Sequence, residues 1–109
     1  MTTLATQHCE ACTKATPTLT EAEISAACAE LAPEWTIDDG HLRRHITTTS
    51  FADAFAITTH IALIAQREDH HPDLHVGWGA VDIDLTTHVA GGLTKNDVIL
   101  AARIDRVIG

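Results

Sequence analysis

The chain has 109 residues, a length that predicts one domain with its own hydrophobic core. Fifteen acidic residues against seven basic ones give a formal net charge of −8, which disfavours nucleic acid and anionic membranes as partners. No apolar run is long enough to span a membrane and no signal peptide is indicated, so we expect a cytoplasmic protein. Three cysteines, an odd number, argue against a disulfide framework.

The first 19 residues are rich in threonine and show no periodicity. They predict a flexible N-terminal arm (1–19) in front of a single domain (20–109). The arm carries Cys9 and Cys12 as a lone Cys-x-x-Cys. Such a pair fits a redox site or half of a zinc site. Because the chain has no second pair, two ordinary thiols in a mobile tail are the simpler interpretation.

Three helices are predicted from their capping residues. Thr20 and Glu23 have the spacing of a capping box and predict a helix from about residue 21 to 31. Ser50 suits the N-cap of a helix over 51–68, and Thr94 that of a helix over 95–107. The middle helix is apolar over much of its circumference, which favours a homodimer or homotetramer. The alternative is burial beneath the other two helices.

Four strands fill the intervals between these helices. They are expected over residues 34–37 and 41–49, joined by a turn at 38–40, and over 74–78 and 81–88, joined by a turn at Gly79-Ala80. The order α-β-β-α-β-β-α with antiparallel hairpins predicts an α+β fold. We expect a four-stranded antiparallel sheet with three helices packed on one face.

The turn at Gly79-Ala80 fixes a register for the central hairpin. The predicted facing pairs are Trp78 and Val81, Val76 and Ile83, Leu74 and Leu85, His75 and Asp84, and, by extrapolation, His71 and His88. Alternation places one apolar set toward the core: Leu74, Val76, Trp78, Val81, Ile83 and Leu85. The open face would then carry a histidine cluster.

A catalytic site is predicted at one end of this hairpin, where His70-His71, His88 and Asp97 converge. Each has a structural explanation alone; Asp97, for example, can simply cap the last helix. Together, imidazoles that titrate near neutral pH suit the elimination or addition of water by general acid/base catalysis. A metal bound by His71, His75, His88 and Asp84 is the rival, but an open sheet face encloses ligands poorly. We therefore expect neither a metal nor a cofactor.

The same residues resemble a known family. The segment Asp69-His70-His71-Pro72, then Trp78, His88 and residues 90–97 (Ala-Gly-Gly-Leu-Thr-Lys-Asn-Asp), is similar to the signature of the pterin-4a-carbinolamine dehydratases. Similarity extends through residues 51–65 and 96–103, and the arm resembles that of bacterial members. The family fold, four antiparallel strands with three helices on one side, agrees with the predicted order of elements.

The resemblance implies dehydration of a 4a-hydroxytetrahydropterin to the quinonoid dihydropterin, in the recycling of the pterin used by aromatic amino acid hydroxylases. It implies that His70 and His88 act as general acid and base, that His71 holds the pterin and that Asp97 orients the histidines. Further positions match the pterin pocket of the family: Pro72, Thr87, Val89 and Ala90.

Some positions depart from the family pattern. Leu74 and His75 replace aromatics of the animal members, and Gln66 stands where these carry glutamate, with Glu68 as the nearest replacement. Relatives also serve as dimerisation partners of a transcription factor or as assembly factors for a carboxylase. A non-catalytic binding role is therefore the alternative, although a pure binder does not need the histidine set.

Overall fold

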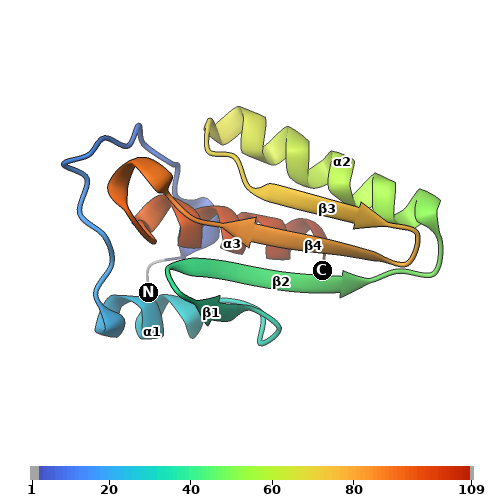
Figure 1. Cartoon of the computed structure of the whole chain (residues 1–109), viewed down its shortest axis with the longest axis horizontal. Helices are drawn as coiled ribbons and strands as arrows, with labels where there is room; N and C mark the ends of the chain where they lie inside the picture. Colours follow the sequence, from blue (N-terminus) through green and yellow to red (C-terminus); the bar gives the residue numbers. More distant parts are fainter. Residues whose placement is uncertain (1–2, 109) are drawn as a thin grey trace.

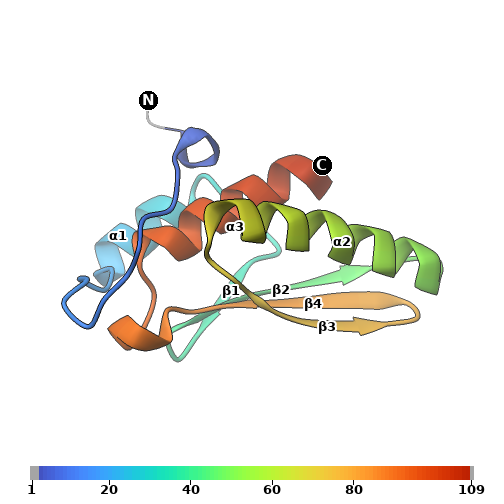
Figure 2. The same cartoon turned by 90° about the horizontal axis from the view of Figure 1, so that it is seen from above.

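The computed structural model describes residues 3–108, so the outermost residues of the predicted arm and domain, 1–2 and 109, lie outside it. In chain order the elements are η1 (Leu4–Thr6), α1 (Glu21–Cys28), β1 (Thr36–Asp38), β2 (His41–Thr47), α2 (Phe51–Glu68), β3 (Asp73–Gly77), β4 (Ala80–Leu85), η2 (His88–Ala90) and α3 (Lys95–Ile108). The strands form one antiparallel sheet in the order β1-β2-β4-β3 (Figure 1). Figure 2 shows α1, α2 and α3 on the same side of this sheet. The predicted α+β fold is confirmed.

The helices begin where their caps predict. The Thr20 side chain accepts from the Glu23 amide while the Glu23 carboxylate accepts from the Thr20 amide, which completes a capping box for α1. Ser50 Oγ accepts from the Asp53 amide at the start of α2. α1 ends at Cys28, three residues earlier than predicted, because i→i−3 bonds tighten the chain from Ala27 to Leu31 into turns.

The core lies between the sheet and the helices. Leu42, Val81 and Leu85 on the inner face of the sheet are fully buried. They belong to one hydrophobic cluster with Ile61 of α2 and Leu100 of α3. Trp35 is buried as well, and its indole Nε1 donates to Asp105 Oδ1 of α3 at 2.7 Å. This bond holds Trp35 against α3, which explains why β1 begins at residue 36 instead of 34.

The predicted register of the central hairpin is wrong by two residues. Gly77 pairs with Ala80, so the turn consists of Trp78 and Gly79. The facing pairs are Leu74 with Ile83, His75 with Asp82 and Val76 with Val81. A shift of two keeps the side chains that remain in the ladder on their predicted faces, because side chains alternate with a period of two. Only Trp78 leaves the inner face, and its side chain is 74% exposed at the turn.

A hydrogen bond from a residue outside the hairpin contacts this turn. The Thr48 amide, just after β2, donates to the Gly79 carbonyl at 2.8 Å. β2 also pairs with β4, with Thr47 opposite Ala80, so the neighbouring strand helps to fix where β4 begins. Neither contact is visible in the local sequence of the hairpin. None of the helices within residues 3–108 has the length and apolar character needed to cross a membrane.

Candidate active site

The centre of the candidate site is a buried pair formed by His70 and Asp97. His70 Nε2 lies 2.6 Å from Asp97 Oδ1. The Asp97 side chain is 0% exposed and the His70 side chain 11%. Since the two residues are 27 positions apart and lie at the ends of different helices, the end of α2 and the start of α3 must both be placed correctly for the pair to form.

A Schellman motif at the end of α2 directs His70 into the site. The His70 amide donates to the Ala65 carbonyl and the Asp69 amide to the Gln66 carbonyl. Asp69 adopts the left-handed conformation (φ 53°, ψ 40°) that this motif requires. Glycine usually occupies such a position, but aspartate is among the residues that tolerate it. The chain therefore turns sharply after α2 and places His70 beside α3.

Asp97 uses its second oxygen to cap α3. Oδ2 accepts from the Thr94 amide at 2.8 Å and from Thr87 Oγ1 at 2.7 Å. The capping role predicted from the sequence and the contact with His70 are thus both present, on different oxygens. Both suit a negative charge, because the N-terminal end of a helix is electropositive.

This network fixes the hydrogen positions. An ionised carboxylate only accepts, so Nε2 of His70 is the donor in its contact with Asp97. The Thr87 hydroxyl gives its one hydrogen to Asp97. In the 2.9 Å contact between the two hydroxyls, Thr94 Oγ1 is therefore the donor to Thr87.

His71 points away from this network. It is exposed, and its Nε2 lies 3.0 Å from Gln66 Oε1. The amide oxygen of Gln66 thus occupies the acceptor position expected for a glutamate. Glu68 is not a substitute for that glutamate, because its carboxylate bonds to the N-terminal arm.

His88, Val89 and Ala90 form η2 instead of the end of a strand. β4 stops at Leu85, and an isolated bridge between Thr87 and Gly92 closes the loop around η2. Gly91 ends η2 with φ 83°, a conformation that favours glycine. His71 and His88 therefore do not face each other in the ladder, and that prediction is wrong. His88 is exposed and directly follows Thr87, which bonds to Asp97.

The structure thus joins three of the predicted site residues by hydrogen bonds: His70, Thr87 and Asp97. His71 and His88 are exposed, and Pro72, Val89 and Ala90 adjoin them in the chain. Sequence reasoning missed the side chain of Thr94, which it treated only as a helix cap.

Histidines elsewhere on the open sheet face bind separate carboxylates. His41 Nδ1 lies 2.6 Å from Asp84, and His45 Nδ1 lies 2.5 Å from Asp82. His75 faces Asp82 and not Asp84. Among residues 3–108, no group of three His, Cys, Asp or Glu side chains is arranged to hold a metal ion.

Glu68 is the second buried carboxylate near the pair. Burial alone would raise the pKa of Glu68, but hydrogen bonds from the Cys9 amide and His8, together with nearby Arg103, hold its pKa below the ordinary value. The pKa of the Cys9 thiol is raised to about 12 by burial and by the charge of Glu68. Cys9 is therefore a protonated, unreactive thiol at neutral pH.

Comparison with known proteins identifies the family of the chain. The sequence model of the family described as pterin 4 alpha carbinolamine dehydratase matches residues 17–107. A relative from Rickettsia canadensis (strain McKiel), provisionally named a pterin-4-alpha-carbinolamine dehydratase, is 39% identical over 99% of this chain and 100% of its own. A second, from Alkaliphilus metalliredigens (strain QYMF) and with the same provisional name, is 38% identical over 97% of this chain and 96% of its own.

Two solved structures share the fold. A transcriptional coactivator/pterin dehydratase from Brucella melitensis has a TM-score of 0.79 and 30% identity, covering 85% of this chain and 100% of its own. A pterin dehydratase-like protein described as a RuBisCO assembly factor has a TM-score of 0.57 and 21% identity, covering 69% of this chain and 87% of its own. The fold and these matches define a protein of the pterin dehydratase class. The chain belongs to the pterin 4 alpha carbinolamine dehydratase family.

Proposed function

We propose that the protein dehydrates a 4a-hydroxytetrahydropterin to the quinonoid dihydropterin and water, as a hydro-lyase in tetrahydropterin recycling. The observation that carries the proposal is the buried contact of 2.6 Å between His70 Nε2 and Asp97 Oδ1. Membership of the family supplies the substrate class. A carbinolamine loses water readily, so positioned proton transfer is sufficient catalysis, worth about 10²- to 10⁴-fold.

In this proposal His70 is the general base and His88 the general acid, the reverse of the order expected from the family resemblance. With Nε2–H held by Asp97, the Nδ1 atom of His70 is the nitrogen that accepts the proton from the pterin ring. His88 then donates a proton to the departing 4a-hydroxyl, which leaves as water. One proton is taken up and one is released, so the reaction is neutral overall. Asp97 orients His70 and stabilises the imidazolium that forms.

The remaining residues of the site bind the substrate. His71, held by Gln66, contacts the pterin together with Pro72 and with the segment Thr87 to Ala90, which contains η2. No metal or cofactor takes part in this scheme. After a separate two-electron reduction to the tetrahydropterin, the product returns to aromatic amino acid hydroxylases, which makes these enzymes the metabolic partners. We place the reaction in the cytoplasm, where the three free cysteines stay reduced.

The direct test is stopped-flow dehydration of chemically generated 4a-hydroxytetrahydropterin. We expect the protein to accelerate the reaction, and His70→Ala and His88→Ala each to lower kcat by about 10²-fold or more. His60→Ala, which removes an exposed histidine in the middle of α2, is the control and retains wild-type kcat. If dehydration with the wild-type protein is no faster than in buffer, the proposed dehydratase activity is refuted and the non-catalytic binding role is favoured.

A further inference from the structure

The N-terminal arm contacts both chain segments that carry the His70–Asp97 pair. One contact is Glu68, two residues before His70, and the other is Asn96, directly before Asp97. Both of these polar residues are buried, with 7% and 6% of their surface exposed. Their partners in the arm are the consecutive residues Cys9 and Glu10.

Glu68 is satisfied almost entirely by the arm. Its Oε1 accepts from the Cys9 amide at 2.8 Å, and its Oε2 lies 3.0 Å from His8 Nδ1. Arg103 of α3 lies 3.9 Å from the same carboxylate and donates to the Gln7 carbonyl. Without the arm, the Glu68 carboxylate would lose the Cys9 amide and His8 and keep only the more distant guanidinium of Arg103.

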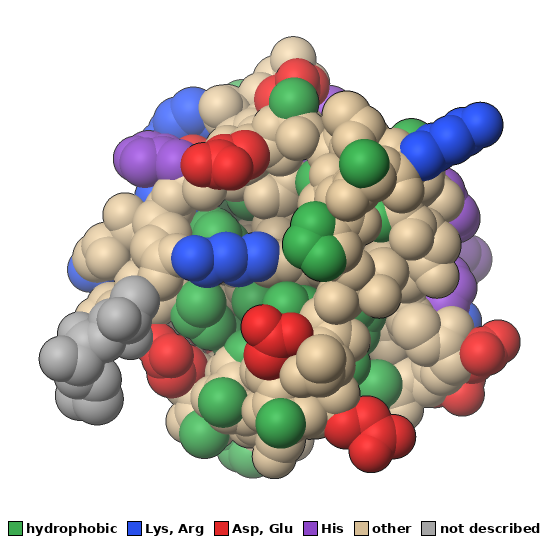
Figure 3. All heavy atoms as spheres, turned by 90° about the vertical axis from the view of Figure 1, so that its left-hand side faces the viewer, with side chains coloured by type: hydrophobic (Ala, Val, Ile, Leu, Met, Phe, Trp, Pro, Cys, Tyr) green, Lys and Arg blue, Asp and Glu red, His purple; other side chains and the backbone are tan. Residues whose placement is uncertain are grey.

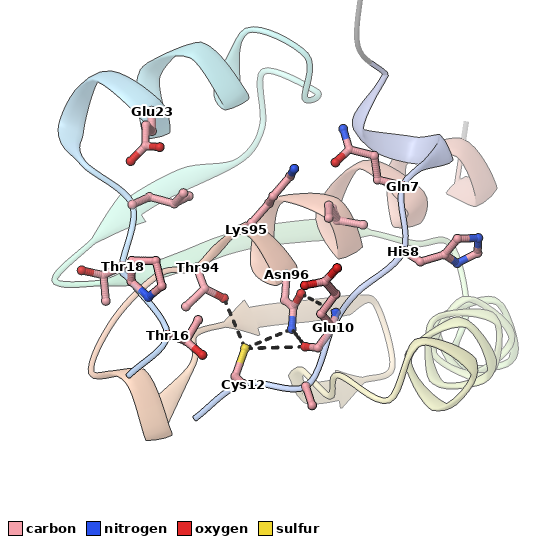
Figure 4. A pocket seen from close by; sticks show the side chains of 14 residues that line it. Gln7, His8, Glu10, Cys12, Thr16, Thr18, Glu23, Thr94, Lys95 and Asn96 are labelled. Atoms are coloured by element: carbon pink, nitrogen blue, oxygen red, sulfur yellow. Dashed lines mark hydrogen bonds between the residues drawn. The ribbon is translucent and has the colours of Figure 1, made fainter. Parts of the chain in front are cut away.

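Asn96 binds the arm at two points. Its Oδ1 accepts from the Glu10 amide at 3.0 Å, and its Nδ2 donates to the Glu10 carbonyl and to Cys12 Sγ. Cys9 Sγ approaches the Asn96 carbonyl at 3.6 Å. Figure 4 shows Asn96, Glu10 and Cys12 pointing toward one another, with Thr94 on the other side of the Cys12 sulfur at 3.9 Å. Thr94 is the hydroxyl that donates to Thr87 in the site.

A cavity of about 720 Å³ lies beside these anchors. Residues of the arm between Gln7 and Leu19, the start of α3 and Glu23 of α1 line it. In the space-filling view of this end of the molecule, hydrophobic side chains lie recessed between charged ones (Figure 3). The arm is therefore held by polar contacts at residues 8–12 and by apolar packing of Leu4, Ala5, Cys9 and Leu19 against the core.

We propose that docking of arm residues His8 to Cys12 positions the His70–Asp97 pair, with Glu68 and Asn96 as the positioning residues. Two neighbouring arm residues bind the end of α2 and the start of α3, so the arm fixes the separation of the two segments that must bring His70 and Asp97 together. This inference rests on the proposed function. A misplacement of about 1 Å from a remote change lowers rates by up to about 100-fold.

The test compares two glutamates that both bind amides of the arm. Glu68→Ala should lower kcat by about 10- to 100-fold with a smaller change in KM, and Glu68→Gln, which keeps an acceptor for the Cys9 amide, should restore much of the loss. Glu30→Ala is the matched control, since Glu30 binds the Leu4 amide at the other end of the arm. It should leave kcat within about 2-fold, because no contact of Glu30 reaches the segments around the pair.

NMR titration of the His70 imidazole supplies a readout that global stability does not move. Its midpoint should shift in Glu68→Ala and stay at the wild-type value in Glu30→Ala. Should Glu68→Ala fail to fold, His8→Ala removes one partner of Glu68 from the surface, where the His8 side chain is 76% exposed, and should shift kcat and the midpoint in the same direction.

Wild-type kcat and an unchanged His70 midpoint in a folded Glu68→Ala or His8→Ala protein would overturn the inference. Equal loss in Glu30→Ala would overturn it too, because the effect would then reflect general stability. If the wild-type protein does not accelerate dehydration, the proposed function fails, and the NMR comparison still decides whether the arm controls the pair.

Discussion

At the scale of single residues, Asp97 has two roles because a carboxylate has two oxygens. Oδ2 caps α3 through the Thr94 amide and accepts from Thr87, while Oδ1 holds His70. The sequence suggested a cap and a catalytic partner as competing explanations. The structure makes them compatible, since the stability of the helix start and the orientation of the imidazole come from the same buried group.

Asp97→Asn replaces one of the two carboxylate oxygens with an amide nitrogen. One end of the amide becomes a donor, so it can no longer accept from His70 and from Thr94 and Thr87 together. We expect kcat to fall by about 10²- to 10⁴-fold and the free energy of unfolding to fall by about 1–3 kcal/mol. Stopped-flow kinetics and thermal denaturation measure the two effects.

Asp53→Asn is the matched control for this substitution. Asp53 lies in the first turn of α2, where its amide donates to the N-cap Ser50 and its carboxylate accepts from Thr49. It is exposed and remote in sequence from the histidines, so kcat should stay within about 2-fold. Retention of wild-type kcat by Asp97→Asn would contradict the role given to the pair.

At the scale of elements, the arm is held by more contacts than its composition suggested. Leu4 and Ala5 in η1 are buried, and the Leu19 amide donates to the Leu93 carbonyl. Between these ends, the polar contacts of Glu68 and Asn96 hold residues 8–12. The boundary at residue 19 between a flexible arm and the domain stays a prediction.

Acid should release the middle of the arm. The folded pKa of Glu68 is lowered because bonds from the Cys9 amide and His8 and the charge of Arg103 outweigh the effect of burial. A lowered carboxyl pKa contributes stability above the unfolded value of about 4.3, and this contribution is lost as pH falls through the folded pKa. The loss therefore follows the titration of Glu68 itself.

Hydrogen exchange or NMR shifts of the Cys9 amide should therefore report undocking below about pH 4. In Glu68→Gln this acid transition should disappear, because the side chain no longer titrates. An acid transition of the Cys9 amide that persists unchanged in Glu68→Gln would assign the effect to another group.

At the scale of the whole molecule, α2 exposes large apolar side chains on the surface. Its inner side is buried at Ala54, Ile61 and Ala65, whereas Phe51, Phe55 and Leu63 are 54%, 59% and 60% exposed. The two phenylalanine rings lie 6.3 Å apart. The wide apolar stripe is therefore not explained by burial beneath the other helices, and we propose that this side of α2 mediates a homodimer or homotetramer.

Phe55→Asp should weaken that association by at least about 30-fold, because a buried aromatic anchor contributes about 2 kcal/mol or more. Light scattering over a concentration series measures the change. Ile37→Asp, at an exposed apolar residue of the edge strand β1, is the control and should leave the oligomer intact. A wild-type protein that is monomeric at all concentrations would refute the proposed interface.

The sequence by itself determined the order of the elements, the starting points of the three helices and the sorting of the two sheet faces. These properties are local or follow a fixed period, so the residues that decide them are close in the chain. The spacing around His70, His88 and Asp97 also identified the family, because a motif is preserved even where its geometry is unknown.

Only the tertiary structure decided the hairpin register, the partners of the histidines and the course of the arm. The turn at Trp78-Gly79 depends on Thr48 and on the pairing of β4 with β2. The Glu68 carboxylate accepts a hydrogen bond from the Cys9 amide, which is 59 residues away in the chain. Such contacts join segments distant in the chain. Their geometry follows from how the helices and strands pack together, and no local pattern encodes it.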